Sequence, residues 1–173
     1  MMRRGEVFLM DKLILGIIIV VFCSLCGFLL AKKYRKRKFF FAQLYQFNER
    51  FLNEISYYRR PLNEFVSQFP YKGEFALALE LYFQNVKNGE SIPLDLRENN
   101  NFTFLTEEEK NGIADYFHML GKGDSASQKA YFSSRKESLQ KWQSEAETIA
   151  KKYGDLYVKL GFLFGLFLLI LLI

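Results

Sequence analysis

The chain has few residues that could carry out chemistry. Its 173 residues include one histidine, two cysteines and one tryptophan. The single histidine, His118, cannot by itself form a catalytic triad or a metal site. No G-x-x-x-x-G-K-[ST] motif is present, which excludes a P-loop nucleotide site. The acidic run 107–109 lies at a predicted helix start, where it complements the helix dipole. The sequence therefore predicts no enzyme, no metal site, no cofactor and no small-molecule substrate.

Cysteine is confined to one apolar segment. Cys23 and Cys26 form a C-x-x-C pattern in the middle of that segment. Thiolates are disfavoured in such surroundings, so we interpret both residues as small side chains on a helix-packing face. No cysteine lies outside it, which excludes disulfides and zinc–thiolate sites from the polar part of the chain.

Apolar residues, by contrast, are abundant and concentrated at the two ends of the chain. Residues 13–31 read LILGIIIVVFCSLCGFLLA, and residues 156–173 read LYVKLGFLFGLFLLILLI with one charge, Lys159. Each segment is about as long as a bilayer core is thick when it is helical. We predict an N-terminal tail over 1–12, transmembrane helices over 13–31 and 156–173, and one soluble domain over 32–155.

Charge is distributed unevenly around these segments. The chain has a net charge of +5, but residues 39–155 contain 14 Lys and Arg against 17 Asp and Glu. The other cations flank or enter the apolar segments, so the soluble domain lacks the basic patch that nucleic-acid binding requires. The run KKYRKRK at 32–38 directly follows the first segment. Positive charge beside a span marks the cytoplasmic side, so we predict that 32–155 is cytoplasmic and that both termini lie across the membrane.

The soluble domain has the apolar spacing of helices throughout. In 39–58, apolar residues recur every three or four positions; they are Phe40, Leu44, Phe47, Phe51, Ile55 and Tyr58. Pro61 ends this helix. Shorter helices are predicted over 62–69, 74–88 and 106–120. One long helix is predicted from about 125 into the second apolar segment, and its apolar repeat of four and three residues continues through Leu156 and Leu160. The predicted fold is all-α, an antiparallel bundle of five or six helices anchored by an N-terminal and a C-terminal transmembrane helix.

Glycines mark one face of the second span. Gly161 and Gly165 form a G-x-x-x-G pattern, and Gly154 lies seven residues before Gly161 on the same face. Small residues let helix backbones approach closely in lipid. We expect this face to pack on the first span or on a helix of a partner.

Two turns are predicted to lie together, far from the membrane. The first helix and the last helix return to the same bilayer, so their far ends should lie at similar height. Pro61 and Gly121 stop helices, and Asp124 is placed to cap the last helix. Other residues of the turns are not needed for turning and favour a protein interface. The predicted partner-binding set is Tyr57, Tyr58, Arg59, Arg60, Lys122, Asp124 and Gln128.

Several motifs together resemble the stage III sporulation protein AB family of endospore-forming bacteria. They are E-I-x-Y-x-x-x-P-L from Glu54, L-G-x-x-D-x-x-x-Q from Leu120, and V-K-L-G-F-L from Val158 followed by Gly165. Residues 85–105 and the segment before Met10 depart from the family pattern, and Met10 is an alternative start.

The resemblance implies a scaffold in the channel-like complex that links mother cell and forespore. Members have a soluble domain that is similar to the cytoplasmic helical bundle of the inner-membrane platform protein of type II secretion and type IV pilus machines. The implied location is the outer forespore membrane, with the soluble domain in the mother-cell cytoplasm. The implied partners are a secretion-type ATPase and other membrane proteins of the complex, and self-association stays open. The alternative is a membrane-anchored regulatory adaptor that binds a soluble signalling partner.

Overall fold

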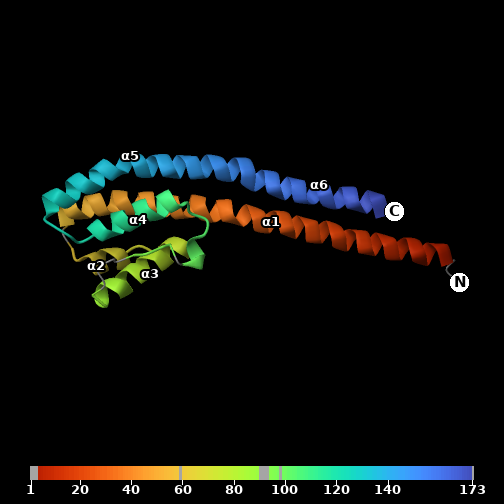
Figure 1. The fold of residues 1–173 in the computed structure, drawn as a ribbon, viewed down its shortest axis with the longest axis horizontal. Coiled ribbons are helices and arrows are strands. Elements are labelled where there is room, and N and C mark those ends of the chain that lie inside the picture. The colour runs from red at the N-terminus through yellow and green to blue at the C-terminus, as the bar shows by residue number, and fades with distance from the viewer. Residues whose placement is uncertain (1–3, 59, 90–93, 98, 173) are drawn as a thin grey trace. The chain divides into compact units, whose positions relative to one another are not determined.

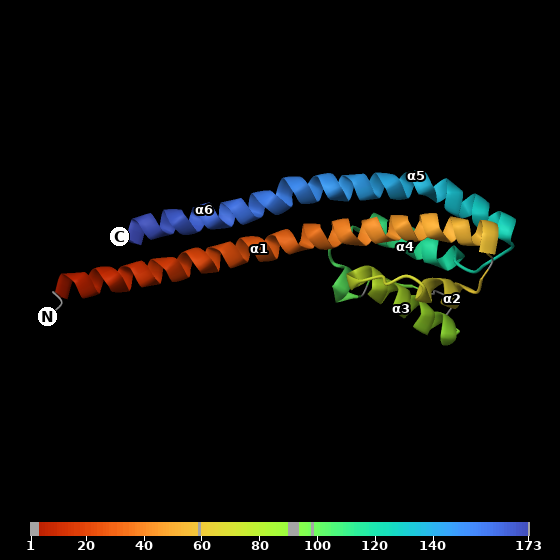
Figure 2. The same cartoon turned by 180° about the vertical axis from the view of Figure 1, so that it is seen from behind.

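The structure, a computed structural model, describes residues 4–58, 60–89, 94–97 and 99–172 (Figures 1 and 2). The described residues contain helices and no strand, which confirms the all-α prediction. The helices are α1 (Arg4–Asn53), the π-helix η1 (Glu54–Tyr58), α2 (Leu62–Ser67), α3 (Gly73–Lys87), the 3₁₀ turn η2 (Asn100–Phe102), α4 (Glu107–Met119), α5 (Ser125–Ile149), the π-helix η3 (Ala150–Gly154) and α6 (Asp155–Leu172).

The chain forms two compact units. One consists of residues 1–35 together with 147–173, and the other of residues 36–146. We call the first the helical hairpin and the second the bundle. Helix α1 and the helical run from α5 to α6 contribute residues to both units.

The bundle is built around aromatic side chains of α1. Phe40, Leu44, Phe47, Phe51 and Ile55 are buried, as the spacing in this helix predicts. The Phe47 ring centroid lies 5.6 to 6.4 Å from rings on α2, α3 and α4. Such edge-to-face contacts add to the stability that apolar burial provides. The core therefore forms where the other bundle helices close on one face of α1.

The predicted helix boundaries are set by local chemistry. Thr106 accepts a hydrogen bond from the Glu109 backbone, and the Glu109 side chain accepts one from the Thr106 backbone, which completes a capping box at the start of α4. Gly121 follows the end of α4 with a φ of 73°, a left-handed conformation that favours glycine.

The π-helix η1 changes the face that α1 presents at its end. Tyr58 continues the apolar spacing that runs from Phe40 to Ile55, yet it is 66% exposed. A π-turn takes in one more residue than an α-turn, so the residues beyond it rotate away from the expected face. Tyr58 thereby moves from the core side of the helix to its surface.

The second π-helix, η3, has the same effect before α6. Leu156 and Leu160 continue the apolar repeat of this helix, but they are 42% and 50% exposed. Ala150 and Gly154, which lie within η3, are buried instead. The extra residue in η3 shifts the face, so that glycine positions rather than leucine positions point inward.

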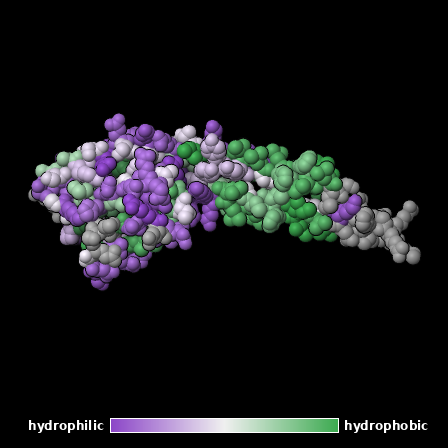
Figure 3. Space-filling view, in the orientation of Figure 1, coloured by the Kyte–Doolittle hydropathy of each residue, from purple (hydrophilic) through white to green (hydrophobic). Residues whose placement is uncertain are grey.

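Two helical segments have the length and composition to cross a membrane. They lie in Ile14–Tyr58 and Ser125–Leu171, and only 17% and 11% of their most apolar windows are buried. The core helix of a soluble protein would be mostly buried. Figure 3 shows the resulting apolar surface on the hairpin. This exposed apolar area indicates association with a membrane.

Candidate functional site

The first predicted turn is closed by one buried carboxylate. Glu54 is 4% exposed and accepts three hydrogen bonds from Arg60, from the backbone nitrogen at 3.0 Å, Nε at 2.9 Å and a terminal guanidinium nitrogen at 2.7 Å. These bonds hold the pKa of Glu54 below its ordinary value and raise the pKa of Arg60. The pair links η1 to Arg60, the residue before Pro61 and α2.

The second predicted turn is organised by Asp124. Its carboxylate accepts hydrogen bonds from the Ser127 backbone at 2.8 Å and from the Ser127 hydroxyl at 3.1 Å, which places Asp124 as a cap before α5. The backbone hydrogen bond is the main cause of the lowered pKa of Asp124. Gln128 then donates from Nε2 to the carbonyl of Lys122 at 3.1 Å. Backbone φ values of 73° at Gly121 and 77° at Gly123 complete the turn.

The two turns meet at one shallow depression of about 190 Å³. Its lining comes from both turns and from the end of α1; it comprises Phe51, Glu54, Ile55, Arg60, Leu62, Gly121, Gly123, Ser125 and Gln128. Tyr57 and Tyr58 precede Arg60 and are 79% and 66% exposed. Exposing two adjacent tyrosines forgoes the stability that their burial would provide.

The residues of the predicted partner-binding set differ in role. The sequence predicts that Arg60 is not needed to form the turn, but its guanidinium is ion-paired with Glu54. Asp124 and Gln128 serve the turn itself through the hydrogen bonds described above. Tyr57, Tyr58 and Lys122 remain as exposed side chains of the set. Arg59 lies outside the described residues.

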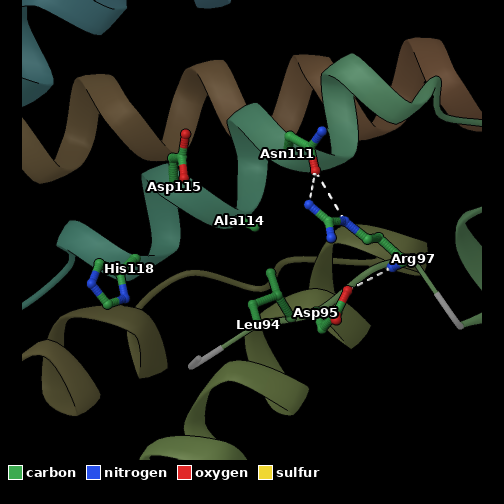
Figure 4. A pocket seen from close by; sticks show the side chains of 7 residues that line it. All are labelled: Leu94, Asp95, Arg97, Asn111, Ala114, Asp115 and His118. Carbon is green, nitrogen blue, oxygen red and sulfur yellow. Dashed lines mark hydrogen bonds between the residues drawn. The ribbon is translucent and has the colours of Figure 1, made fainter. Parts of the chain in front are cut away.

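A second depression, of about 320 Å³, lies against α4 (Figure 4). Arg97 donates to Asn111 Oδ1 across it, at 3.1 Å from Nε and 2.6 Å from a terminal guanidinium nitrogen, and its backbone nitrogen donates to Asp95. His118 is exposed at its edge, 3.0 Å from the Lys122 ammonium. Among the described residues, no group of three or more His, Cys, Asp or Glu side chains could hold a metal ion.

Glycines bring the two helices of the hairpin into close contact. A Cβ atom placed on Gly161 would lie 2.6 Å from the Cys23 carbonyl oxygen, and one on Gly165 would lie 2.8 Å from the Val20 Cα. A Cβ atom on Gly27 would lie 2.5 Å from the Tyr157 carbonyl oxygen. The positions along one helix rise as those along the other fall, so the helices pack antiparallel. Gly154 differs, because a Cβ atom there would meet nothing within 4 Å.

Ion pairs with the basic run were missed by the sequence reasoning. Arg37 donates from Nε to a Glu109 carboxylate oxygen at 3.0 Å, and Lys36 pairs with Glu74. Their partners lie far away in the sequence, on α4 and α3. The sequence shows only that these helices have acidic residues in their first turns. Such residues are already explained by their favourable interaction with the helix dipole, so they did not point to Lys36 or Arg37.

The family model for stage III sporulation protein AB matches residues 12–173. The chain belongs to the stage III sporulation protein AB family. This confirms the resemblance that the turn and span motifs indicated. No curated protein and no solved structure matches the chain. Members of this family are sporulation proteins, so the helical bundle and the two apolar helices belong to a protein of spore formation.

Proposed function

We propose that the protein is a structural platform subunit of the channel-like sporulation complex between mother cell and forespore. In this proposal the hairpin anchors it in the outer forespore membrane, and the bundle lies in the mother-cell cytoplasm. The depression between the two turns, together with the exposed Tyr57 and Tyr58, docks a secretion-type ATPase. Family membership supports the role in sporulation. The exposure of Tyr57 and Tyr58 beside a formed depression is the observation that carries the docking surface.

Tyrosine and arginine are the side chains on which protein interfaces most often depend. Tyr57 is 79% exposed. The Arg60 guanidinium lies 4.9 Å from the Tyr58 ring centroid and covers that ring only in part. The Glu54 pair holds Arg60 in place, so the aromatic surface is presented on a rigid support. A rigid support lowers the entropy cost of binding.

The antiparallel hairpin supports a platform role in a second way. The glycines of each hairpin helix contact the backbone of the other helix, so the two helices pack against each other within one chain. An anchor of this kind tethers the chain to the membrane through both of its apolar segments. Among the described residues of the bundle, Tyr57 and Tyr58 are the most exposed aromatic side chains.

Co-purification from sporulating cells tests the docking surface. The full chain, solubilised in mild detergent, should retain the secretion-type ATPase of the complex. Changing Tyr57→Ala together with Tyr58→Ala should reduce the retained ATPase at least about tenfold, because interface tyrosines commonly carry that much affinity. Both side chains are exposed, so the circular-dichroism signal should stay at the wild-type level.

Val86→Ala is the matched control, because Val86 is 48% exposed on α3 and lies outside the depression. This variant should retain the ATPase fully. Retention of the ATPase by the double tyrosine variant would refute the docking surface. Loss of a soluble signalling protein instead of the ATPase would favour a regulatory adaptor over a platform.

A further inference from the structure

The basic run 32–38 divides into two parts with different roles. Lys36 and Arg37 are used inside the bundle, where they pair with Glu74 and with the buried carboxylate of Glu109. Lys32 and Lys33 belong to the hairpin, are exposed, and have no ion-pair partner among the described residues. Two of the six cations in a run that looks like a single topology signal therefore serve the fold of the bundle, and two others remain available.

Cations from the second helix of the hairpin gather near the same level. The Lys152 ammonium lies 5.4 Å from the Tyr153 ring centroid. Tyr153 in turn stacks on Tyr34, with ring centroids 5.7 Å apart, and Tyr157 stacks on Tyr34 at 5.8 Å. Tyr34 stands between Lys33 and Arg35 in the chain. The tyrosine stack therefore joins the basic segments of both helices.

This layer carries a strong excess of positive charge. We call its six cations the basic collar; they are Lys32, Lys33, Arg35, Lys151, Lys152 and Lys159. Only two carboxylates, Glu147 and Asp155, lie in the same stretches, 28–35 and 147–159. Lys151 pairs with Glu147, and the Arg35 guanidinium rests 5.2 Å from the Phe28 ring centroid. Most of the collar is left without a counter-charge within these two stretches.

We infer that the basic collar is a binding surface for the headgroups of anionic phospholipids. It directly borders the exposed apolar surface of the hairpin, which includes Phe28, Leu29 and Leu30 on α1. Tyrosine rings favour the headgroup level of a bilayer, and lysine and arginine beside a span attract anionic lipid. A phosphodiester at this level would meet ammonium groups of both helices and tyrosine hydroxyls together.

The bilayer is a better match to the collar than an acidic protein. The cations follow the apolar band of each helix within a few residues, so they lie at the height where lipid phosphates are concentrated. Long lysine side chains can also reach that level while their stems cover apolar surface. Lys159 lies within the apolar segment itself, and only extension toward the headgroups would solvate its charge.

Lipid selectivity of the full chain tests this inference. The chain is reconstituted in nanodiscs of phosphatidylcholine containing either spin-labelled phosphatidylglycerol or spin-labelled phosphatidylcholine. The fraction of motionally restricted label gives the preference for the anionic headgroup. Nanodiscs expose both faces, so inverted insertion does not affect the result. The wild-type chain should prefer phosphatidylglycerol several-fold at low salt and lose that preference at high salt.

Changing Lys32→Gln together with Lys33→Gln should remove most of this preference. Lys87→Gln with Lys129→Gln removes the same charge from exposed positions of the bundle and should leave it unchanged. Lys32→Arg with Lys33→Arg keeps the charge and should restore the preference.

Three results would overturn the inference. They are a wild-type chain without headgroup preference, an equal loss in the bundle control, and a preference abolished by inorganic phosphate but not by chloride of equal ionic strength. The last would show that the collar takes a free anion rather than a lipid. None of these measurements involves the ATPase, so their outcome is independent of the proposed platform function.

Discussion

A methyl group at Gly161 should force the two hairpin helices apart. The Cβ atom of Gly161→Ala would lie 2.6 Å from the Cys23 carbonyl oxygen and 3.1 Å from the Gly27 Cα, whereas ordinary contacts begin near 3.4 Å. The helices must therefore separate locally by about 0.8 Å. Both obstructing atoms belong to the backbone, so no side-chain rotation can relieve the clash.

The cost follows from the contacts that such a shift weakens. A gap of this size forfeits a quarter to a half of each van der Waals contact along the seam. Overpacking of a tight interface typically costs about 1–3 kcal/mol. We expect Gly161→Ala to lower the free energy of separating the helices by about that amount. Gly154→Ala, where the methyl group meets nothing within 4 Å, should be neutral or stabilise by up to about 1 kcal/mol.

The assay is an SDS titration of the full chain in detergent micelles, followed by energy transfer between dyes on Ile14→Cys and Leu171→Cys. Both positions are exposed. Cys23 and Cys26 are changed to Ala in every variant, which keeps the Cβ of Cys23 in the seam. If Gly161→Ala shifts the transition no further than Gly154→Ala, the glycine-mediated register of the hairpin is wrong.

Two further predictions concern the bundle and are read from thermal unfolding. Glu54→Gln should lower the Tm by about 5 °C or more at pH 7, because it removes a buried carboxylate from its Arg60 partner. The pKa of Glu54 is lowered in the folded state, so its contribution to stability is present above the unfolded pKa and disappears as pH falls through the folded pKa. The Tm values of the wild type and Glu54→Gln should therefore converge at acid pH. A Tm difference that stays constant with pH would contradict this. Asn48→Ala should destabilise the bundle by about 2–3 kcal/mol, because it leaves the buried Tyr116 hydroxyl without its acceptor and leaves a cavity where a fully buried side chain stood, whereas Tyr116→Phe should cost about 1 kcal/mol. Equal costs would contradict this account of the Asn48 site.

Local signals were sufficient for the helices and many of their ends. The three- and four-residue spacing from Phe40 to Ile55 identified the core face of α1, and Thr106 with Glu109 identified the start of α4. Such signals depend on residues within one or two turns of each other. Tyr58 and Leu156 continue the same spacing but are exposed, because a π-turn adds a residue without leaving a mark in the apolar pattern.

The sequence predicted where the candidate site lies better than it predicted the role of each of its residues. That the two turns lie together followed from helix lengths and from the two apolar ends of the chain, and the turns do line one depression. The role of Arg60 did not follow, because a charged residue beside a turn looks the same whether it is free or paired. The Glu54 carboxylate, six residues earlier, is brought to it only by the closed loop.

The sequence by itself determined that this is a helical protein with two apolar ends, a polar middle and a place in the sporulation family, since composition, periodicity and short motifs are properties of neighbouring residues. The tertiary structure alone decided how the basic run is divided. Arg37 finds Glu109 on α4, whereas Lys32 finds no carboxylate among the described residues. Electrostatic pairing depends on distance in space, and residues five apart on one helix belong to different units of the chain.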